Sequence, residues 1–474
     1  MMYKPLAAIL LIIFLFQFSC KNKESHHIFP FLDGIKDLSG IKYGILKVPE
    51  DHDHPEKGTI ELVWVKISPA KGSEYSEPLI FLTGGPGEHT LEYLPFLMEL
   101  AEVYKREVII YDQRGIGFSS SLPDFGKALP ALFAENLTLE EEYIRLKNLL
   151  SVTSDSIQVM GQNLSNYNTF QNANDAGHIM DHFGFDQYIL FGGSYGTRLG
   201  RVIMDLFPNR IKAAILDSPA LFENDFIKMR IKSFAQSLEL IFSYCETDSN
   251  CRSMYPDLRR DYKEGLTDLQ NQPMMITLNS TDFVLNAQDA MYFLRYLMYR
   301  SNSKETVPEI IKAIKNRDTD KISEMFQPLA SMMSSGNLTM FLATERFEFY
   351  DKTIDEQQLY EWYEEYGHFP APMGLFHNLY LAAKDWMEDE ADPSRRQFYP
   401  SEVPAIIFVN KYDPVTPPSN GYAMLEDLSN GFLFVLDEEG HGQGNFDCKI
   451  EVTKNFLINV TQKPDPGCLN VVLQ

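Results

Sequence analysis

Basic residues are scarce in this sequence of 474 residues, where 42 lysines and arginines stand against 66 aspartates and glutamates, giving a net charge of −24. Because phosphate binding needs a basic surface, we expect no nucleic-acid partner. Internal repeats and low-complexity segments are also absent. A hydrophobic content of 44% and a charged content of 23% are ordinary for a soluble globular protein, and the length predicts two or three structural units.

The apolar run at the N-terminus, 6–16, is too short to span a membrane comfortably as a mature helix. It follows Lys4 and is typical of a secretory signal. The run ends at Phe18-Ser19-Cys20, which resembles a bacterial lipoprotein signal, in which the cysteine becomes the lipidated first residue. We therefore expect a signal peptide over 1–19 and a polar, lipidated tether over 20–35. An ordinary cleaved signal peptide with an incidental cysteine is the alternative.

This N-terminus predicts an exported lipoprotein of the cell envelope, facing the periplasm or the outer surface. Contact with the membrane is then expected only through the N-terminal lipid anchor.

Cysteine is rare, and the count of five is odd, which in an exported protein predicts one cysteine with a separate role. Cys245 lies close in sequence to Cys251, and Cys448 and Cys468 both lie near the C-terminus. Local pairing gives two disulfides in an oxidising compartment and leaves Cys20 for the lipid. Five buried or unpaired thiols are the alternative.

Short β-rich runs alternate with helical stretches from about residue 36 to Asp217. This alternation predicts a mostly parallel sheet covered by helices on both faces. The expected strands are 60–67, 78–82, 107–111, 188–191 and 213–216, and the expected helices include 173–183 and 198–207.

The pattern changes between about 219 and 399, where strand signals are scarce and amphipathic helical patterns such as 226–244, 287–299 and 307–314 dominate. Strand signals return at 405–409 and 432–436. We therefore predict an α/β fold whose core is formed by 36–218 and 400–474. A helical cap over 219–399 is expected to be inserted after the sixth strand.

A candidate nucleophile stands in the segment Gly192-Gly193-Ser194-Tyr195-Gly196, which follows an apolar strand and precedes a helix. This G-x-S-x-G pattern in a strand-to-helix turn is typical of a nucleophile elbow, where glycines on either side prevent clashes. The helix that follows points its positive end toward the oxyanion that forms on attack. A glycine-rich turn with a capping serine is the structural alternative.

A nucleophilic serine needs a base, and in α/β-hydrolases the acid and then the histidine follow the serine along the chain. His441 comes just after the last expected strand, where a loop can present its imidazole at the edge of the sheet. The remaining histidines after Ser194 are His368 and His377, which fall in the aromatic helical insertion, where packing or surface roles are more common.

Asp413 follows the expected strand 405–409 and opens an Asp-Pro turn. Such turns are frequently structural, but the order strand, acid, strand, histidine favours Asp413 as the residue that orients His441. Asp217, at the end of an earlier strand, is the reserve candidate.

Thr83-Gly84-Gly85-Pro86-Gly87 follows the expected strand 78–82. Small residues here allow backbone N–H groups to approach a developing oxyanion. Since Pro86 has no N–H group, we expect the donors to be Gly85 and, after the serine, Tyr195. A plain turn is the alternative.

Together these segments resemble the proline iminopeptidase and tripeptidyl aminopeptidase family of α/β-hydrolase serine peptidases. The resemblance is carried by Gly-Gly-Pro-Gly at 84–87, Tyr-Asp-Gln-Arg-Gly at 111–115, Gly-Gly-Ser-Tyr-Gly-Thr at 192–197, Asp-Pro-Val-Thr-Pro-Pro at 413–418, Val-Pro-Glu-Asp-His at 48–52, and the cysteine regions. It implies an exopeptidase that needs no cofactor and acts on peptides with a free N-terminus.

Such an enzyme must recognise an ammonium group, which carboxylates near the cap do best. The resemblance points to Glu345 as a substrate-binding residue, with Glu348 and Asp351 as neighbours, although a solvated helix face is the alternative. This sequence lacks the cysteines that many relatives carry near Glu345 and Trp386. Arg114 is expected to pair with Asp112 and to shape the floor of the substrate pocket.

Two other functions remain open from the sequence. An esterase or amidase that acts on small ligands would use the same triad of Ser194, Asp413 and His441. A catalytically silent hydrolase fold could instead serve as a surface binding protein. No metal is expected to take part in the enzymatic alternatives.

Overall fold

The computed structural model describes residues 29–33, 35, 37–222, 226–330, 336–387, 389–437, 440–442 and 446–471. The predicted signal peptide and Cys20 lie outside these residues. The part of the chain before Asp37 contributes one short 3-10 helix, Pro30–Leu32 (η1). None of the helices in the described ranges has both the length and the apolar character needed to cross a bilayer.

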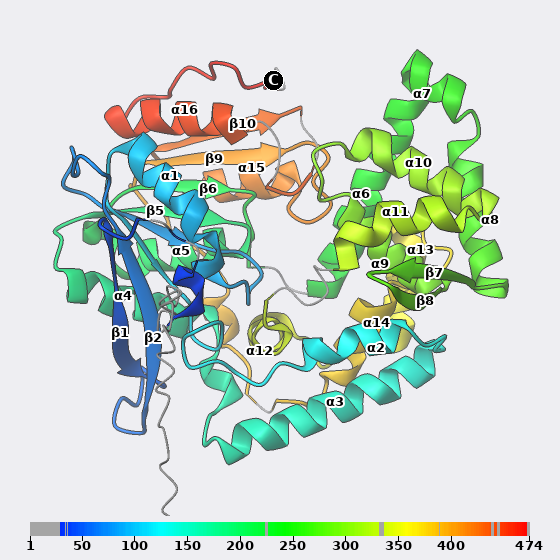
Figure 1. Ribbon diagram of the computed structural model, residues 1–474, viewed down its shortest axis with the longest axis horizontal. Coiled ribbons are helices and arrows are strands. Elements are labelled where there is room, and N and C mark those ends of the chain that lie inside the picture. The colour runs from blue at the N-terminus through cyan, green and yellow to red at the C-terminus, as the bar shows by residue number, and fades with distance from the viewer. Residues whose placement is uncertain are drawn as a thin grey trace, which may run out of the picture. The chain divides into compact units, whose positions relative to one another are not determined.

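From Asp37 onward the described chain is organised around an eight-stranded sheet of order β1-β2-β4-β3-β5-β6-β9-β10 (Figure 1). β1 and β2 form an antiparallel pair, and β2 also runs antiparallel to β4. The six strands β4, β3, β5, β6, β9 and β10 are parallel to one another. The strands are β1 (Ile41–Pro49), β2 (Thr59–Ile67), β3 (Leu79–Leu82), β4 (Val108–Tyr111), β5 (Tyr188–Gly193), β6 (Ile211–Asp217), β9 (Ala405–Asn410) and β10 (Gly431–Leu436).

The parallel strands are buried along most of their length, as continuous apolar runs in a doubly covered sheet should be. All seven expected strands occur within a few residues of their predicted ranges. β1 was not expected, because it is an edge strand with many partly or fully exposed side chains and a weak apolar signal.

Helices cover both faces of this sheet. Helices α4 (Thr169–Phe183), α5 (Tyr195–Leu206) and α15 (Pro418–Glu426) pack in one cluster with Ile80, Leu82 and Leu190. Phe81 and Phe191 alternate with those residues and therefore point to the opposite face. There Phe81 contacts Phe96 of α1 (Leu94–Tyr104), whose ring lies 5.0 Å from Phe446 of α16 (Phe446–Ile458).

Between β6 and β9 the described chain is helical apart from one antiparallel hairpin, β7 (Met274–Leu278) with β8 (Thr281–Leu285). We call this region the cap. Its helices are α6 (Phe226–Thr247), α7 (Ser249–Met254), α8 (Leu258–Asn271), α9 (Ala287–Leu297), α10 (Ser303–Asn316), α11 (Thr319–Ala330), α12 (Leu338–Phe349), α13 (Glu356–Tyr366) and α14 (Gly374–Ala382).

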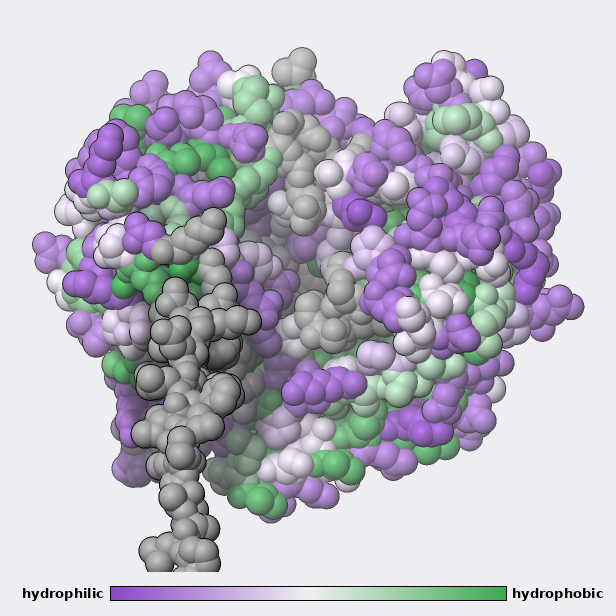
Figure 2. Space-filling model, viewed as in Figure 1, coloured by the Kyte–Doolittle hydropathy of each residue, from purple (hydrophilic) through white to green (hydrophobic). Residues whose placement is uncertain are grey.

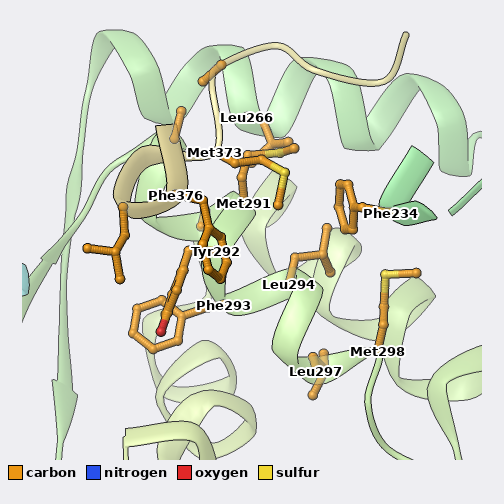
Figure 3. Packing of buried hydrophobic residues seen from close by; sticks show 14 of the residues in the cluster. Phe234, Leu266, Met291, Tyr292, Phe293, Leu294, Leu297, Met298, Met373 and Phe376 are labelled. Carbon is orange, nitrogen blue, oxygen red and sulfur yellow. The ribbon is translucent and has the colours of Figure 1, made fainter. Parts of the chain in front are cut away.

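A large apolar cluster holds the cap together. Figure 3 shows Met291 and Leu294 of α9 packed among Phe234 of α6, Leu266 of α8 and Phe376 of α14. Hydrophilic residues cover the outer surface over α7, α8 and α10 (Figure 2). The cap helices are therefore amphipathic, with their apolar sides turned inward.

Two helices that precede the cap in sequence belong to the same apolar cluster. α2 (Leu129–Phe133) contributes Phe133, and α3 (Leu139–Val159) contributes Leu146 and Leu150. α3 begins with a capping box in which Thr138 and Glu141 exchange hydrogen bonds. The hydrophobic core of the cap thus contains residues from chain segments that precede β5 and from segments that follow β6.

Both expected disulfides are present. Cys245–Cys251 joins the last turn of α6 to α7, and Cys448–Cys468 ties α16 to the C-terminal segment. The local pairing predicted from the sequence is confirmed.

A pair of buried carboxyl groups lies where α3 meets the cap. The amide of Gln288 donates a hydrogen bond to Glu142, at 2.9 Å, and Asp289 is close enough for the two acids to repel each other. Both are almost completely buried. Burial raises the pKa of Glu142 to about 7 and raises the pKa of Asp289 well above its ordinary value.

We predict that Glu142→Gln stabilises the protein at pH 8 but not at pH 4. Because the folded state holds the proton of Glu142 more tightly than the unfolded state, wild-type stability falls as the pH rises from about 4.5 through about 7. The full effect on the free energy of unfolding is about 3 kcal/mol. Urea unfolding at both pH values measures it. Glu140→Gln, at an exposed position of the same helical turn, is the control, and equal pH dependence in all three proteins would contradict the prediction.

Candidate active site

Ser194 occupies a sharp turn between β5 and α5. Its backbone angles are φ 53° and ψ −122°, a strained conformation for a residue with a side chain. A Cβ atom on Gly192 would lie 2.4 Å from the carbonyl oxygen of Gly196, and one on Gly196 would lie 2.0 Å from that of Leu82. Only glycine fits at these two positions, so the Gly-x-Ser-x-Gly sequence is a steric requirement of the turn.

His441 and Asp413 lie beside this turn. The imidazole Nε2 of His441 is 2.9 Å from Ser194 Oγ, and its Nδ1 is 2.8 Å from Asp413 Oδ2. Asp413 follows β9 and His441 follows β10, so both stand at the carboxyl edge of the parallel strands, as Ser194 does. The structure brings together the three residues that the sequence singled out.

The Asp413 carboxylate is fixed by its own loop. Its Oδ1 accepts hydrogen bonds from the backbone N–H groups of Val415 and Thr416, and its Oδ2 accepts one from the Thr416 hydroxyl. The buried carboxylate therefore fixes the His441 ring with Nδ1–H toward itself, and Nε2 is left to accept the Ser194 proton.

The two candidate oxyanion donors lie on the same pocket wall as Ser194. Gly85 has φ 103° and is exposed, and Tyr195 is the first residue of α5. The Tyr195 hydroxyl is held away from the nucleophile by hydrogen bonds from Thr169 and Asn172. Its backbone N–H, at the positive end of the helix, is the group that can serve an oxyanion.

The cap holds the backbone on both sides of this site. The carbonyl of Tyr299, just after α9, accepts a 3.0 Å hydrogen bond from the N–H of His441. The carbonyl of Gly87, in the loop after β3, accepts one from the N–H of Asn337 at the start of α12, at 2.8 Å. The Tyr299 ring also packs edge-on against the His441 imidazole.

A pocket opens beside Ser194. The core contributes Gly85, Tyr195, Arg198, Val415, Thr416 and Asn420, and the cap contributes Ala220, Leu221, Met229, Arg230, Glu345 and Phe349. The pocket is therefore completed by the cap and has both apolar and charged walls.

Glu345 lines this pocket as part of a buried ion cluster. Its carboxylate lies 3.3 Å from the guanidinium of Arg198 and 3.3 Å from that of Arg230. Arg198 also pairs with Glu348, at 3.0 Å. Burial raises the pKa of Glu348, although the positive charge of Arg198 acts against that rise. Two carboxylates and two guanidinium groups thus balance one another.

The sequence did not single out either arginine. Arg198 lies four residues after Ser194, which places it on the same side of α5, and this helical spacing was the signal that could have revealed it. Arg230 lies on α6 and carries no such signal, because only the fold brings the cap to the core.

Arg114 does not line the pocket, and the expected ion pair with Asp112 is wrong. All five N–H groups of the buried Arg114 side chain are used, two by Asp175 and three by backbone carbonyls. Asp112 instead accepts hydrogen bonds from the backbone N–H groups of Leu91 and Phe118. The fully buried guanidinium joins the end of β1, the 3-10 helix Leu164–Asn166 and α4.

Asp217, the reserve candidate for the acid, and the two other histidines after Ser194 have other partners or surroundings. Asp217 forms a buried ion pair with Lys449, at 2.9 Å, and within the described chain no hydrogen bond joins it to His441. His368 pairs with Glu239, and burial lowers the pKa of His377 to about 4. Both histidines belong to the cap.

The sheet order, the strained serine turn and the adjoining histidine and carboxylate define a hydrolase of the α/β class. The chain belongs to the alpha/beta hydrolase fold family, whose sequence model matches residues 77–443. The fold class and the family resemblance expected from the sequence are confirmed.

Curated relatives are peptidases by name. The chain is 24% identical to serine protease Hip1 of Mycobacterium tuberculosis, over 91% of this chain and 87% of that protein. It is 27% identical to a tripeptidyl aminopeptidase of Streptomyces lividans, over 38% of this chain and 35% of that protein. Among solved structures, proline iminopeptidase of Mycobacterium smegmatis matches with a TM-score of 0.41 and 14% identity, over 88% of this chain and 99% of that chain.

Asp413 and Asp217 have different contacts, which predict different effects when each is replaced by asparagine. Asp413→Asn should reduce kcat by roughly 10⁴-fold, because the amide favours the wrong tautomer of His441. Asp217→Asn should lower stability through its partner Lys449 but change kcat only a few-fold. Rates on a chromogenic acyl substrate, together with thermal unfolding, distinguish the two; a larger kcat loss in the Asp217 variant would make Asp217 the acid.

Proposed function

We propose that this protein is a serine exopeptidase that removes residues from the free N-terminus of peptides through an acyl-enzyme on Ser194. The observation that carries the proposal is the pair of contacts that His441 makes, 2.9 Å to the Ser194 hydroxyl and 2.8 Å to the Asp413 carboxylate. The names of the relatives support peptides as the substrate class.

In the proposed mechanism, Ser194 Oγ attacks the scissile carbonyl carbon while His441 Nε2 takes the hydroxyl proton. Asp413 stabilises the imidazolium that results. The backbone N–H groups of Gly85 and Tyr195 stabilise the oxyanion of the tetrahedral intermediate. His441 then donates the proton to the departing amine, and a water molecule, activated by the same imidazole, hydrolyses the acyl-enzyme.

The pocket beside Ser194 is the proposed binding site for the residue that is released. Phe349, Leu221 and Met229 give it apolar wall area, and Glu345 is its carboxylate. Because Arg198 and Arg230 hold Glu345 on both sides, its proposed contribution is to a charge-balanced wall with a fixed geometry.

We predict that Ser194→Ala abolishes hydrolysis of aminoacyl chromogenic substrates, since no other group can form the acyl-enzyme. A fluorophosphonate probe should label the folded wild-type protein and not the variant. Turnover by the variant at the wild-type rate would rule out the mechanism. Activity of the wild type on acyl esters, with none on free-amine peptides, would instead identify an esterase. Failure of the probe to label folded wild type would favour a binding protein.

We also propose that the protein is exported and anchored through a lipid on Cys20. The two disulfides support an oxidising compartment. Mass spectrometry of the protein from its native membrane should find a mature N-terminus at Cys20 that carries acyl chains. An unmodified mature N-terminus at another residue would contradict the anchor and leave the proposed peptidase activity untouched.

A further inference from the structure

In the described part of the chain, three charged side chains line the pocket beside Ser194, and the most exposed of them is a cation. The side chain of Arg230 is 17% exposed, against 8% for Arg198 and 3% for Glu345. A substrate group that enters the pocket therefore has more access to the Arg230 guanidinium than to the Glu345 carboxylate.

The carboxylate of Glu345 is shared between two guanidinium groups. Both Nη nitrogens of Arg230 contact one oxygen, Glu345 Oε2, at 3.3 Å, and the other oxygen lies 3.3 Å from Arg198 Nη1. Charge-assisted hydrogen bonds are usually shorter, at about 2.7–2.9 Å. The negative charge of Glu345 is thus divided between two cations at long distances.

A guanidinium group in this pocket can pair with more than one carboxylate. Arg198 already does so, with Glu345 at 3.3 Å and Glu348 at 3.0 Å. A guanidinium carries more N–H groups than one carboxylate can use. A carboxylate of the substrate can therefore join Glu345 on Arg230 in the same manner.

Arg295 of α9 adds a positive charge behind the pocket wall. The guanidinium carbons of Arg230 and Arg295 each lie 5.3 Å from the centroid of the Phe376 ring, so the two groups share this ring. Arg295 is 1% exposed, its Nη1 donates a hydrogen bond to the Tyr299 hydroxyl, and in the described chain no carboxylate forms an ion pair with it. Burial lowers the pKa of Arg230, and the charge of Arg295 acts in the same direction, against that of Glu345.

The wall groups balance one another, and Arg295 is the charge in excess. The cluster in the described part of the chain consists of Arg198, Arg230, Arg295, Glu345 and Glu348. Burying a charge without a counter-charge is costly. One carboxylate from the substrate would balance the cluster, whereas a neutral or cationic group would leave the excess in place.

We propose that this pocket binds a carboxylate and that Arg230 makes the protein selective for peptides whose N-terminal residue is aspartate or glutamate. The inference rests on the exopeptidase function proposed above and on the assignment of this pocket to the released residue. Arg230 contacts the carboxylate of the released side chain. Arg295 strengthens the attraction through its charge, from behind the Phe376 ring.

The test compares α-glutamyl p-nitroanilide with glutaminyl p-nitroanilide, which has nearly the same shape and no negative charge. For the wild type, kcat/KM on the glutamyl substrate should be higher by roughly tenfold or more, mainly through a lower KM. Arg230→Gln should remove this preference while changing the rate on the glutaminyl substrate only a few-fold. Arg230→Lys, which keeps a positive charge, should retain part of it.

Lys232→Gln is the matched control, because it removes one positive charge from the same helix, α6, at a position that does not line the pocket. It should leave the preference unchanged. Fluorophosphonate labelling of Ser194 shows that each variant is folded. Equal changes on both substrates in Arg230→Gln would overturn the role of Arg230.

Glu345→Gln gives a readout of opposite sign. It removes the carboxylate that shares Arg230, so the preference for the glutamyl substrate should increase. A variant that is merely damaged would lose activity on both substrates and could not gain selectivity. A preference that falls in Glu345→Gln would contradict the proposal.

A dipeptide tests a second source of the carboxylate. Alanyl-alanine and alanyl-alaninamide should be cleaved at similar rates, because the proposed carboxylate belongs to the released side chain. Faster cleavage of the free acid, lost in Arg230→Gln, would place the carboxylate on the departing residue and overturn the selectivity for acidic N-terminal residues.

The failure of this inference differs from the failure of the proposed function. A wild-type protein that cleaves acyl esters but no free-amine substrate would refute the exopeptidase function itself. A working aminopeptidase that hydrolyses the glutaminyl substrate as fast as the glutamyl one would refute only the selectivity proposed for Arg230.

Discussion

The structure depends on the contact between the serine turn and the end of β3. The Cα of Gly196 stands so near the carbonyl of Leu82 that no side chain could be accommodated there. This contact fixes the first turn of α5 against the loop that carries Gly85. It determines both the conformation of Ser194 and the place where an oxyanion can be stabilised. Asp413 follows β9 and His441 follows β10, so both lie at the same edge of the sheet as this contact.

Charge is balanced at the pocket beside this edge. On the cap side, Glu345 and Glu348 are balanced by Arg198 and Arg230, so the wall has little net charge and a rigid geometry.

Much of this arrangement could be predicted from the sequence, because it follows from local sequence patterns. Continuous apolar runs predicted the buried strands, and the glycines around Ser194 predicted the turn. The order of Asp413 and His441 after successive strands placed both at one edge. Features that arise only from tertiary contacts were missed: the pairing of Arg198 with two cap glutamates, the packing of α3 into the cap, and the use of Arg114 as a fastener for Asp175. The hairpin β7–β8 was missed for a related reason, since it pairs only with itself inside a helical region.

Two backbone hydrogen bonds join the cap to the catalytic loops: the N–H of His441 donates to the Tyr299 carbonyl, and the N–H of Asn337 donates to the Gly87 carbonyl. A displacement of α9 or α12 that widened access to the serine would release the general base or loosen the oxyanion loop. Admission of a peptide and bond cleavage would then be separate events in time. In the proposed mechanism, catalysis therefore requires the cap to be in place against both loops.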